Sequence, residues 1–179
     1  NELVDLNEAA REVMALSSSE LRRNGLIVES ALGDGLGSVT GDRIQLQQVI
    51  LNLLLNASDA MSEVDSRPRQ LVIMTEQDGG NRVRLSVRDT GVGFDPESVD
   101  RLFEAFYTTK SSGMGMGLSI SRSIIENHHG RLWAALNDGP GATFSFSVPC
   151  RPAAATSVPI ASALRVPDGP PAQLQARNP

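Results

Sequence analysis

The chain has 179 residues, of which 40% are hydrophobic, and a formal net charge of −5. This length and apolar content suffice for one well-formed core, so we expect one globular domain. The acidic balance argues against nucleic-acid binding, which would need a basic face. The single Cys150 excludes an intramolecular disulfide and suits a reducing, cytoplasmic environment. No apolar run reaches the roughly 18–20 residues that span a bilayer, so we expect no direct membrane contact.

The first elements are predicted by apolar spacing. The chain starts at Asn1 without a Met, and the pattern there places its first residues inside a helix. We therefore interpret it as a piece of a longer polypeptide. Helical spacing over 5–24, with Asp5 as a cap, predicts the first complete helix. Residues 26–32 predict a strand, and 38–40 predict a short extended stretch.

A long helix is predicted from the cap Asp42 to about Met61, and its polar side chains form one narrow stripe. The stripe, at spacings of three and four, consists of Gln45, Gln48, Asn52, Asn56, Asp59 and Glu63. Nearly all other positions are apolar, so the helix is buried on most sides and the stripe must face something polar. A buried amide without a partner costs about 1–3 kcal/mol. The stripe is therefore either a solvent seam or the lining of a ligand pocket.

Two hairpins and one more helix complete the predicted fold. Alternating segments at 70–76 and 82–88 predict one hairpin, and 131–137 with 142–148 predict another. A helix is predicted over 118–126. Helices that follow separate groups of strands indicate an α/β fold, a two-layer sandwich with one mixed sheet and helices on one face.

Composition and local sequence bound the ends of these elements. His128 and His129 end the last helix before Gly130, and we interpret them as helix-terminal residues, with Gly130 at the C′ position. Seven of the ten prolines lie from Pro149 onward, among many alanines and few large apolar residues. We therefore expect one domain over 1–149 and a flexible tail or linker over 150–179.

The segment Asp89-Thr90-Gly91-Val92-Gly93 follows a predicted buried strand. Two glycines so close together let a flat ligand approach the backbone. The carboxylate of Asp89 can accept a hydrogen bond from an exocyclic amine. The alternative is a strand-ending turn in which Asp is simply a favourable turn residue.

Three alternating glycines, Gly113, Gly115 and Gly117, run into the start of the last helix. Unpaired backbone N–H groups and the helix dipole at such a place favour a phosphate. The segment is not a Walker A loop, because no Gly-Lys-Ser/Thr follows, and it does not follow a strand directly as a dinucleotide fingerprint would. The alternative is a flexible hinge.

Between the two glycine clusters lie some twenty residues with one short helical signal at 98–106. Irregular segments of this size in compact domains are often lids. The aromatic residues that can anchor this lid are Phe103, Phe106 and Tyr107. The polar residues placed to reach a terminal phosphate are Thr108, Thr109 and Lys110. A small satellite core with solvated polar neighbours is the alternative.

Four blocks, in this order, resemble the ATP-binding catalytic domain of sensor histidine kinases, within the GHKL group of gyrase, heat-shock chaperone and mismatch-repair ATPases. They are the N box at Asn52–Ala57, the G1 box at Asp89–Gly93, the F box at Phe103–Phe106 and the G2 box at Gly113–Leu118. The segment Gly141-Ala-Thr-Phe144 resembles the closing strand. The resemblance covers 1–149, implies a Bergerat fold with a long ATP lid, and is strongest to the oxygen-, nitrogen- and dicarboxylate-sensing branch.

The resemblance also implies roles for individual residues. Asn56 would bind Mg²⁺, which keeps several waters and bridges the phosphates. Asp89 would accept from the adenine amine, with Thr143 supporting through water and with Gly91 and Gly93 under the base. The phosphates would be bound by N–H groups of Gly115, Gly117 and Leu118. The remaining residues expected at ATP are Asn52, Asp59, Thr108, Thr109, Lys110, Gly113 and Met116.

Two departures from the family pattern refine this assignment. Many relatives carry a basic residue and an aromatic three and four positions after the second Asn, whereas this chain has Asp59 and Ala60. Lys110 is therefore the cation expected near the γ-phosphate. Nothing resembles the phosphoacceptor block, a His followed by Glu or Asp at the start of a helical hairpin. The chain would thus bind ATP without holding its own acceptor.

The implied function is to present the γ-phosphate of Mg-ATP to a phosphoacceptor His on the helical hairpin of the same full-length kinase. The phosphoryl group would then pass to the receiver domain of a response regulator. The catalytic residues would be Asn52, Asn56 and Lys110. ATP-hydrolysing relatives place a Glu at the position of Asn52, and an amide cannot act as that base. The alternatives are a GHKL-fold ATP hydrolase, an anti-sigma-type serine kinase and a non-catalytic nucleotide-binding module.

Overall fold

The computed structural model describes residues 1–105, 107–108 and 117–154. The elements in these ranges are β1 (Glu2–Val4), α1 (Leu6–Arg23), β2 (Leu26–Leu32), β3 (Ser38–Gly41), α2 (Arg43–Met61), β4 (Arg69–Gln77), β5 (Arg82–Asp89), the 3₁₀ helix η1 (Pro96–Arg101), α3 (Gly117–Asn127), β6 (Arg131–Leu136) and β7 (Ala142–Arg151). Apart from the helix predicted for the first residues, the helices and strands predicted from the sequence are found, with shifts of a few residues at the ends.

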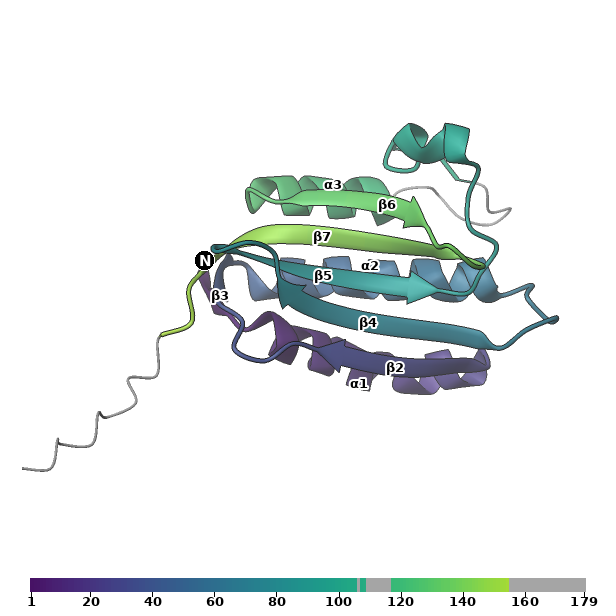
Figure 1. The fold of residues 1–179 in the computed structure, drawn as a ribbon, viewed down its shortest axis with the longest axis horizontal. Coiled ribbons are helices and arrows are strands. Elements are labelled where there is room, and N and C mark those ends of the chain that lie inside the picture. Colours follow the sequence, from purple (N-terminus) through teal and green to yellow (C-terminus); the bar gives the residue numbers. More distant parts are fainter. Residues whose placement is uncertain (106, 109–116, 155–179) are drawn as a thin grey trace, which may run out of the picture.

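The strands form one mixed sheet in the order β1-β3-β7-β5-β4-β2, with β6 also paired to β7. The β2–β4 pair is parallel and the other pairs are antiparallel. The helices α1, α2 and α3 lie side by side over one face of the sheet (Figure 1). This confirms the predicted two-layer α/β sandwich.

Both predicted caps of the long helices are confirmed. The carboxylate of Asp5 accepts hydrogen bonds from the first-turn N–H groups of α1, and Asp42 accepts from the N–H of Gln45 in α2. The apolar face of α2 then enters the core, where Leu46, Ile50 and Leu54 are fully buried. These contacts fix the polar stripe of α2 relative to the sheet. Within the described ranges, no helix combines the length and apolarity needed to cross a membrane.

The start of the chain differs from the prediction. Residues Glu2–Val4 do not lie in a helix but form β1, which pairs with β3 through Leu3 and Thr40. The strand has only three residues, of which Val4 alone is buried. Such a short segment shows no alternation of apolar and polar residues, so the sequence does not predict a strand there. The helix begins after Asp5 because its side chain caps the first turn.

The end of the predicted domain also shifts. β7 continues through Arg151, beyond both the predicted strand end at 148 and the predicted boundary at 149. Cys150 pairs with Val39 of β3, and its N–H donates to the carbonyl of Asn81. A buried free cysteine packs as a small apolar residue, which lets the strand go on. Residues 155–179 of the predicted tail lie outside the described residues.

The end of α3 is a Schellman motif whose left-handed residue is His129 (φ 56°), not Gly130. The Gly130 N–H donates to the carbonyl of Ile125, and that of His129 donates to Glu126. A Cβ on Gly130 would lie 2.7 Å from the carbonyl oxygen of Ser147. Close packing against β7, rather than a positive φ, therefore requires glycine there.

His128 joins the C-terminal end of α3 to the N-terminal end of α2. Its Nε2 accepts the backbone N–H of Asp42 at 3.0 Å, and its Nδ1 lies 2.7 Å from the carbonyl oxygen of Ile124. Because Nε2 accepts this N–H, Nδ1 is left as the ring nitrogen that donates to Ile124. This is a structural histidine, as the helix-end interpretation predicts.

Candidate functional site

Asp89 is the last residue of β5 and is only 1% exposed. Its Oδ1 accepts the N–H of Gly91 at 2.8 Å and the N–H of Ala142 at 3.3 Å. Its Oδ2 has no hydrogen-bond partner, and no other buried side-chain nitrogen or oxygen of the described residues shares this property. Burial raises the pKa of Asp89, while the two N–H donors act in the opposite direction. A buried acceptor of this kind calls for a hydrogen-bond donor that the described residues do not supply.

The backbone after Asp89 is fixed by close contact with α2. The N–H of Val92 donates to the carbonyl oxygen of Ala60 at 3.0 Å. A Cβ on Gly91 would lie 2.5 Å from that same oxygen. Gly93 adopts φ 70°, where a side chain would be strained. Both glycines are needed, but at Gly91 the group that approaches closely is the end of α2 rather than a ligand.

The β6–β7 turn closes the site from the other side. Gly141 adopts φ 87°, and a Cβ there would lie 2.1 Å from the carbonyl oxygen of Asp89. The amide Nδ2 of Asn137 donates to the same oxygen at 2.8 Å. The sequence analysis assigned Asn137 only to the end of a predicted strand. In the sequence it is marked only by directly preceding Asp-Gly-Pro-Gly, and this position does not indicate a hydrogen bond to Asp89.

Thr143 does not lie where the resemblance places it. It is in register with Arg88, and successive strand residues point to opposite faces, so its side chain faces away from Asp89. Its hydroxyl donates to Oδ1 of Asn137 at 2.7 Å. The residue of β7 that reaches the carboxylate is Ala142, through its backbone N–H. In place of the water-mediated support of adenine that the resemblance implies, the structure shows Thr143 linked through Asn137 to the backbone of Asp89.

The polar stripe of α2 faces the first turn of α3. Nδ2 of Asn52 lies 3.3 Å from the carbonyl oxygen of Gly117 and 3.2 Å from Oγ of Ser121. Asn56 lies one turn further along α2 and is half-buried. Ala60 follows one turn later and contacts the backbone after Asp89. The stripe thus connects the start of α3 to the Asp89 segment. The exposed members of the stripe are Gln45, Gln48, Asp59 and Glu63.

Other predicted site residues fall at the edge of the described ranges or outside them. Leu118 is in the first turn of α3, half-buried and packed against the core, and Thr108 is half-buried. The residues that lie outside the described ranges are Phe106, Thr109, Lys110, Gly113, Gly115 and Met116. Their expected roles stay predictions.

The described part of the predicted lid is anchored by aromatic contacts. The rings of Phe94 and Phe103 each lie 6.3 Å from that of Phe144, in edge-to-face geometry. Phe144 is a buried residue of β7. The Arg101 guanidinium lies 4.6 Å from the ring centre of Tyr107. Phe103 thus serves as the aromatic anchor that the sequence suggested.

The residues present fit a magnesium ion only together with a phosphate ligand. In the described ranges no three or more His, Cys, Asp and Glu side chains are grouped closely enough to hold a metal. Mg²⁺ commonly takes one or two protein oxygens and completes its shell with water and substrate phosphates. The amide oxygen of Asn56, on the same stripe as Asn52, would serve as such a ligand.

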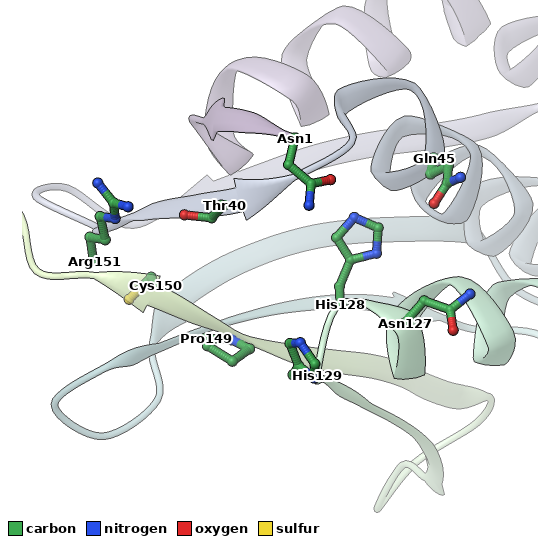
Figure 2. Close-up of a pocket in the computed structure, with 9 residues that line it drawn as sticks. All are labelled: Asn1, Thr40, Gln45, Asn127, His128, His129, Pro149, Cys150 and Arg151. Atoms are coloured by element: carbon green, nitrogen blue, oxygen red, sulfur yellow. The ribbon is translucent and has the colours of Figure 1, made fainter.

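A cavity of about 520 Å³, shown in Figure 2, lies at the end of the sheet opposite Asp89. It is lined in part by His128, His129, Cys150 and Arg151. Both ring nitrogens of His128 are already engaged by backbone groups, and Cys150 accepts a weak hydrogen bond from Gln77. The functional residues predicted from the sequence do not line this cavity.

Comparison with known proteins places this geometry in a family. The model of the histidine kinase-, DNA gyrase B- and HSP90-like ATPases matches residues 41–152. The sensor protein FixL of Bradyrhizobium diazoefficiens is 42% identical over 144 residues, which are 80% of this chain and 28% of FixL. The chain therefore spans less than a third of that relative.

Solved structures agree in fold. The catalytic domain of histidine kinase ThkA superposes with a TM-score of 0.72 at 32% identity, covering 85% of this chain and all of that domain. ThkA in complex with the response regulator protein TrrA gives a TM-score of 0.71 at 32% identity, over 84% of this chain and 42% of the ThkA chain. Full-length ShkA in complex with AMPPNP gives 0.74 at 30% identity, over 86% of this chain and 32% of that one.

Proposed function

Because the chain belongs to the family of histidine kinase-, DNA gyrase B- and HSP90-like ATPases, we propose that it binds Mg-ATP and donates the γ-phosphoryl group to a histidine. Within that family it is a catalytic domain of the histidine-kinase type, as its similarity to FixL and ThkA indicates. The acceptor is the phosphoacceptor hairpin of the same full-length kinase. From there the group passes to a response-regulator receiver domain, the class of partner bound to ThkA.

The observation that carries this proposal is the unpartnered Oδ2 of Asp89. Adenine carries an exocyclic amine, and a buried carboxylate oxygen is a suitable acceptor for it. Bound ATP would supply this donor together with the transferable phosphoryl group. The structure of ShkA with AMPPNP shows that a relative of the same fold holds an ATP analogue.

Asn52 favours transfer to a histidine over hydrolysis. A water-activating residue must accept a proton, and a neutral amide does not. Its Nδ2 also donates to the carbonyl of Gly117 and to Ser121. Asn52 thereby orients the N-terminal end of α3, which is favourable for anions. Asn56 would hold Mg²⁺ through its amide oxygen, and Lys110 would neutralise charge near the γ-phosphate.

Calorimetry with AMPPNP and Mg²⁺ tests nucleotide binding. We expect a saturable heat at millimolar nucleotide or below, and none with the Asp89→Ala variant. Transfer is tested by mixing the chain with a separate phosphoacceptor hairpin and γ-labelled ATP. We expect acid-labile label on the hairpin histidine and negligible free phosphate. Free phosphate alone would indicate an ATP hydrolase, label on serine an anti-sigma-type kinase, and binding without either a non-catalytic module.

A further inference from the structure

Side chains outside the predicted site hold three consecutive backbone carbonyls at its centre. The carbonyl oxygen of Asp89 accepts from Nδ2 of Asn137 at 2.8 Å. The next oxygen, that of Thr90, accepts from Nε of Arg67 at 2.9 Å, and that of Gly91 accepts from Nη2 of Arg67 at 2.8 Å. Arg67 lies in the connection between α2 and β4, outside every block of the family resemblance.

One of these peptide groups lies directly between Arg67 and Asp89. The peptide that joins Thr90 to Gly91 accepts from Arg67 through its carbonyl and donates to Oδ1 of Asp89 through its N–H. The C=O and N–H of a trans peptide point in opposite directions from one rigid plane. The guanidinium on one side therefore determines the direction in which the N–H meets the carboxylate on the other.

The following peptide is fixed in the same way. Its carbonyl, that of Gly91, accepts from Nη2 of Arg67, and its N–H, that of Val92, donates to Ala60 at the end of α2. The planar guanidinium thus spans two neighbouring carbonyls, a geometry that the single ammonium group of lysine does not reproduce. Hydrogen bonds from a charged donor are stronger than neutral ones, and they polarise the peptide that they reach.

We propose that Arg67 is a positioning residue for adenine recognition. By holding the two peptides that follow Asp89, it keeps Oδ1 of that carboxylate engaged with Gly91 and leaves Oδ2 directed at the exocyclic amine of the base. This inference rests on the proposed ATP-binding function and assigns to it a residue that determines base selectivity. Arg67 itself touches neither base nor phosphate in this scheme.

The chain offers a matched control in Arg69. Its guanidinium also donates to backbone carbonyls, those of Val64, Asn24 and Ser62, but none of them belongs to the Asp89 segment. Arg67→Gln removes two contacts to carbonyls, and Arg69→Gln removes three together with the ion pair to Asp65, so the control variant loses at least as many structural contacts. Only the first is expected to alter recognition of the base.

The test measures binding of AMPPNP, inosine triphosphate and inorganic tripolyphosphate by calorimetry. Inosine carries an oxygen in place of the exocyclic amine, so the wild-type chain should prefer AMPPNP. We expect Arg67→Gln to weaken AMPPNP about tenfold, to leave tripolyphosphate unchanged and so to reduce the base preference. Arg69→Gln should lower the thermal midpoint while keeping the preference, and Arg67→Lys should restore part of it. Equal effects of Arg67→Gln and Arg69→Gln on the preference would overturn the proposal.

A nucleotide-free readout separates this inference from the proposed function. The side-chain carboxyl signal of Asp89 can be titrated by NMR in the wild-type and variant chains. We expect Arg67→Gln, but not Arg69→Gln, to raise the pKa of Asp89, because the N–H of Gly91 is then less polarised. An unchanged Asp89 pKa in Arg67→Gln would overturn the positioning role. A wild-type chain that binds no AMPPNP would overturn the ATP function while this titration still decides the role of Arg67.

Discussion

The two ends of β5 border two different kinds of space. At its start, Arg82 pairs with Pro149 beside the cavity of about 520 Å³. At its end, Asp89 sits in a tightly packed segment where a Cβ on Gly91 or Gly141 would meet backbone within 2.5 Å. The roomier end contains His128, which has a partner at each ring nitrogen. The crowded end contains Oδ2 of Asp89, a buried oxygen without a hydrogen-bond partner.

This contrast shows that unmet hydrogen bonding marks the candidate site better than volume does. A histidine with both ring nitrogens already paired gains little from a ligand, whereas a buried acceptor without a donor gains a hydrogen bond. The same difference predicts that mutations at the two ends act on separate properties. Changes near Asp89 should alter nucleotide binding, and changes near His128 should alter stability.

The largest expected effect is that of Asp89→Asn on adenine nucleotides. An amide placed with its NH₂ at Oδ2 would face the adenine amine with a second donor. We expect AMPPNP to bind about 100-fold more weakly, roughly 2.7 kcal/mol, and tripolyphosphate to bind as before. Calorimetry with both ligands measures this. An equal loss for tripolyphosphate would mean that Asp89 supports the whole site and not the base.

The variant His128→Ala should affect stability and spare binding. It removes the acceptor for the N–H of Asp42 and the donor to Ile124. The N–H of Asp42 then lacks its acceptor, whereas the carbonyl of Ile124 still accepts the backbone N–H of residue 128, and the loss should lower the free energy of unfolding by about 2 kcal/mol. Urea denaturation gives that quantity, and AMPPNP affinity of the folded variant should stay within about twofold. A larger drop in affinity would show that the two ends are coupled through α2 and α3.

The raised pKa of Asp89 gives a pH dependence of known sign. In the folded chain the pKa of Asp89 lies above its ordinary value of 3.8, so the carboxyl group keeps its proton to a higher pH than in the unfolded chain. As pH rises from there through the folded-state pKa, the free energy of unfolding should fall, because the ionised form is disfavoured by burial. AMPPNP affinity should rise over the same interval, since only the ionised Oδ2 accepts from the amine. Urea denaturation and calorimetry across this pH interval measure the two trends, with Asp89→Asn as control. A free energy of unfolding that rises through the interval only in the wild-type chain would contradict this account.

The smallest effect is expected at Cys150. It is buried in β7, and its Sγ lies 3.7 Å from Nε2 of Gln77, a weak contact. We expect Cys150→Ser to change the free energy of unfolding by less than about 1 kcal/mol, and AMPPNP affinity not at all. The same two assays apply. A marked gain or loss of nucleotide binding would show that the cavity at this end communicates with the site.

The features that could be predicted from the sequence are those determined by residues close together in the chain. The caps Asp5 and Asp42 were recognisable because each precedes an apolar helical pattern. The carboxylate of Asp89 was recognisable because it ends a strand and is followed by glycines. The spacing of Asn52 and Asn56 predicted one polar face, and Asn52 indeed reaches α3.

What the sequence did not predict depends on contacts between distant segments. The face of the sheet toward which Thr143 points depends on the register between β7 and β5. A shift of that register by one residue would put Thr143 on the face where Ala142 now lies. Arg67 and Asn137 act through backbone carbonyls far along the chain, which leaves no pattern around either residue. The reason for Gly91 lies in Ala60, which the fold alone brings close.

The position of β7 has a consequence for how the domain forms. This strand pairs with β5 along one side and with both β6 and β3 along the other, so it is the member that joins the two halves of the sheet. It is also the last strand of the described chain to leave the ribosome. Until Ala142 to Arg151 are synthesised, β3 and β5 each have an open edge that invites wrong pairing. The sheet should therefore be completed only once β7 has been synthesised, and truncation within β7 should yield aggregation rather than a smaller folded unit.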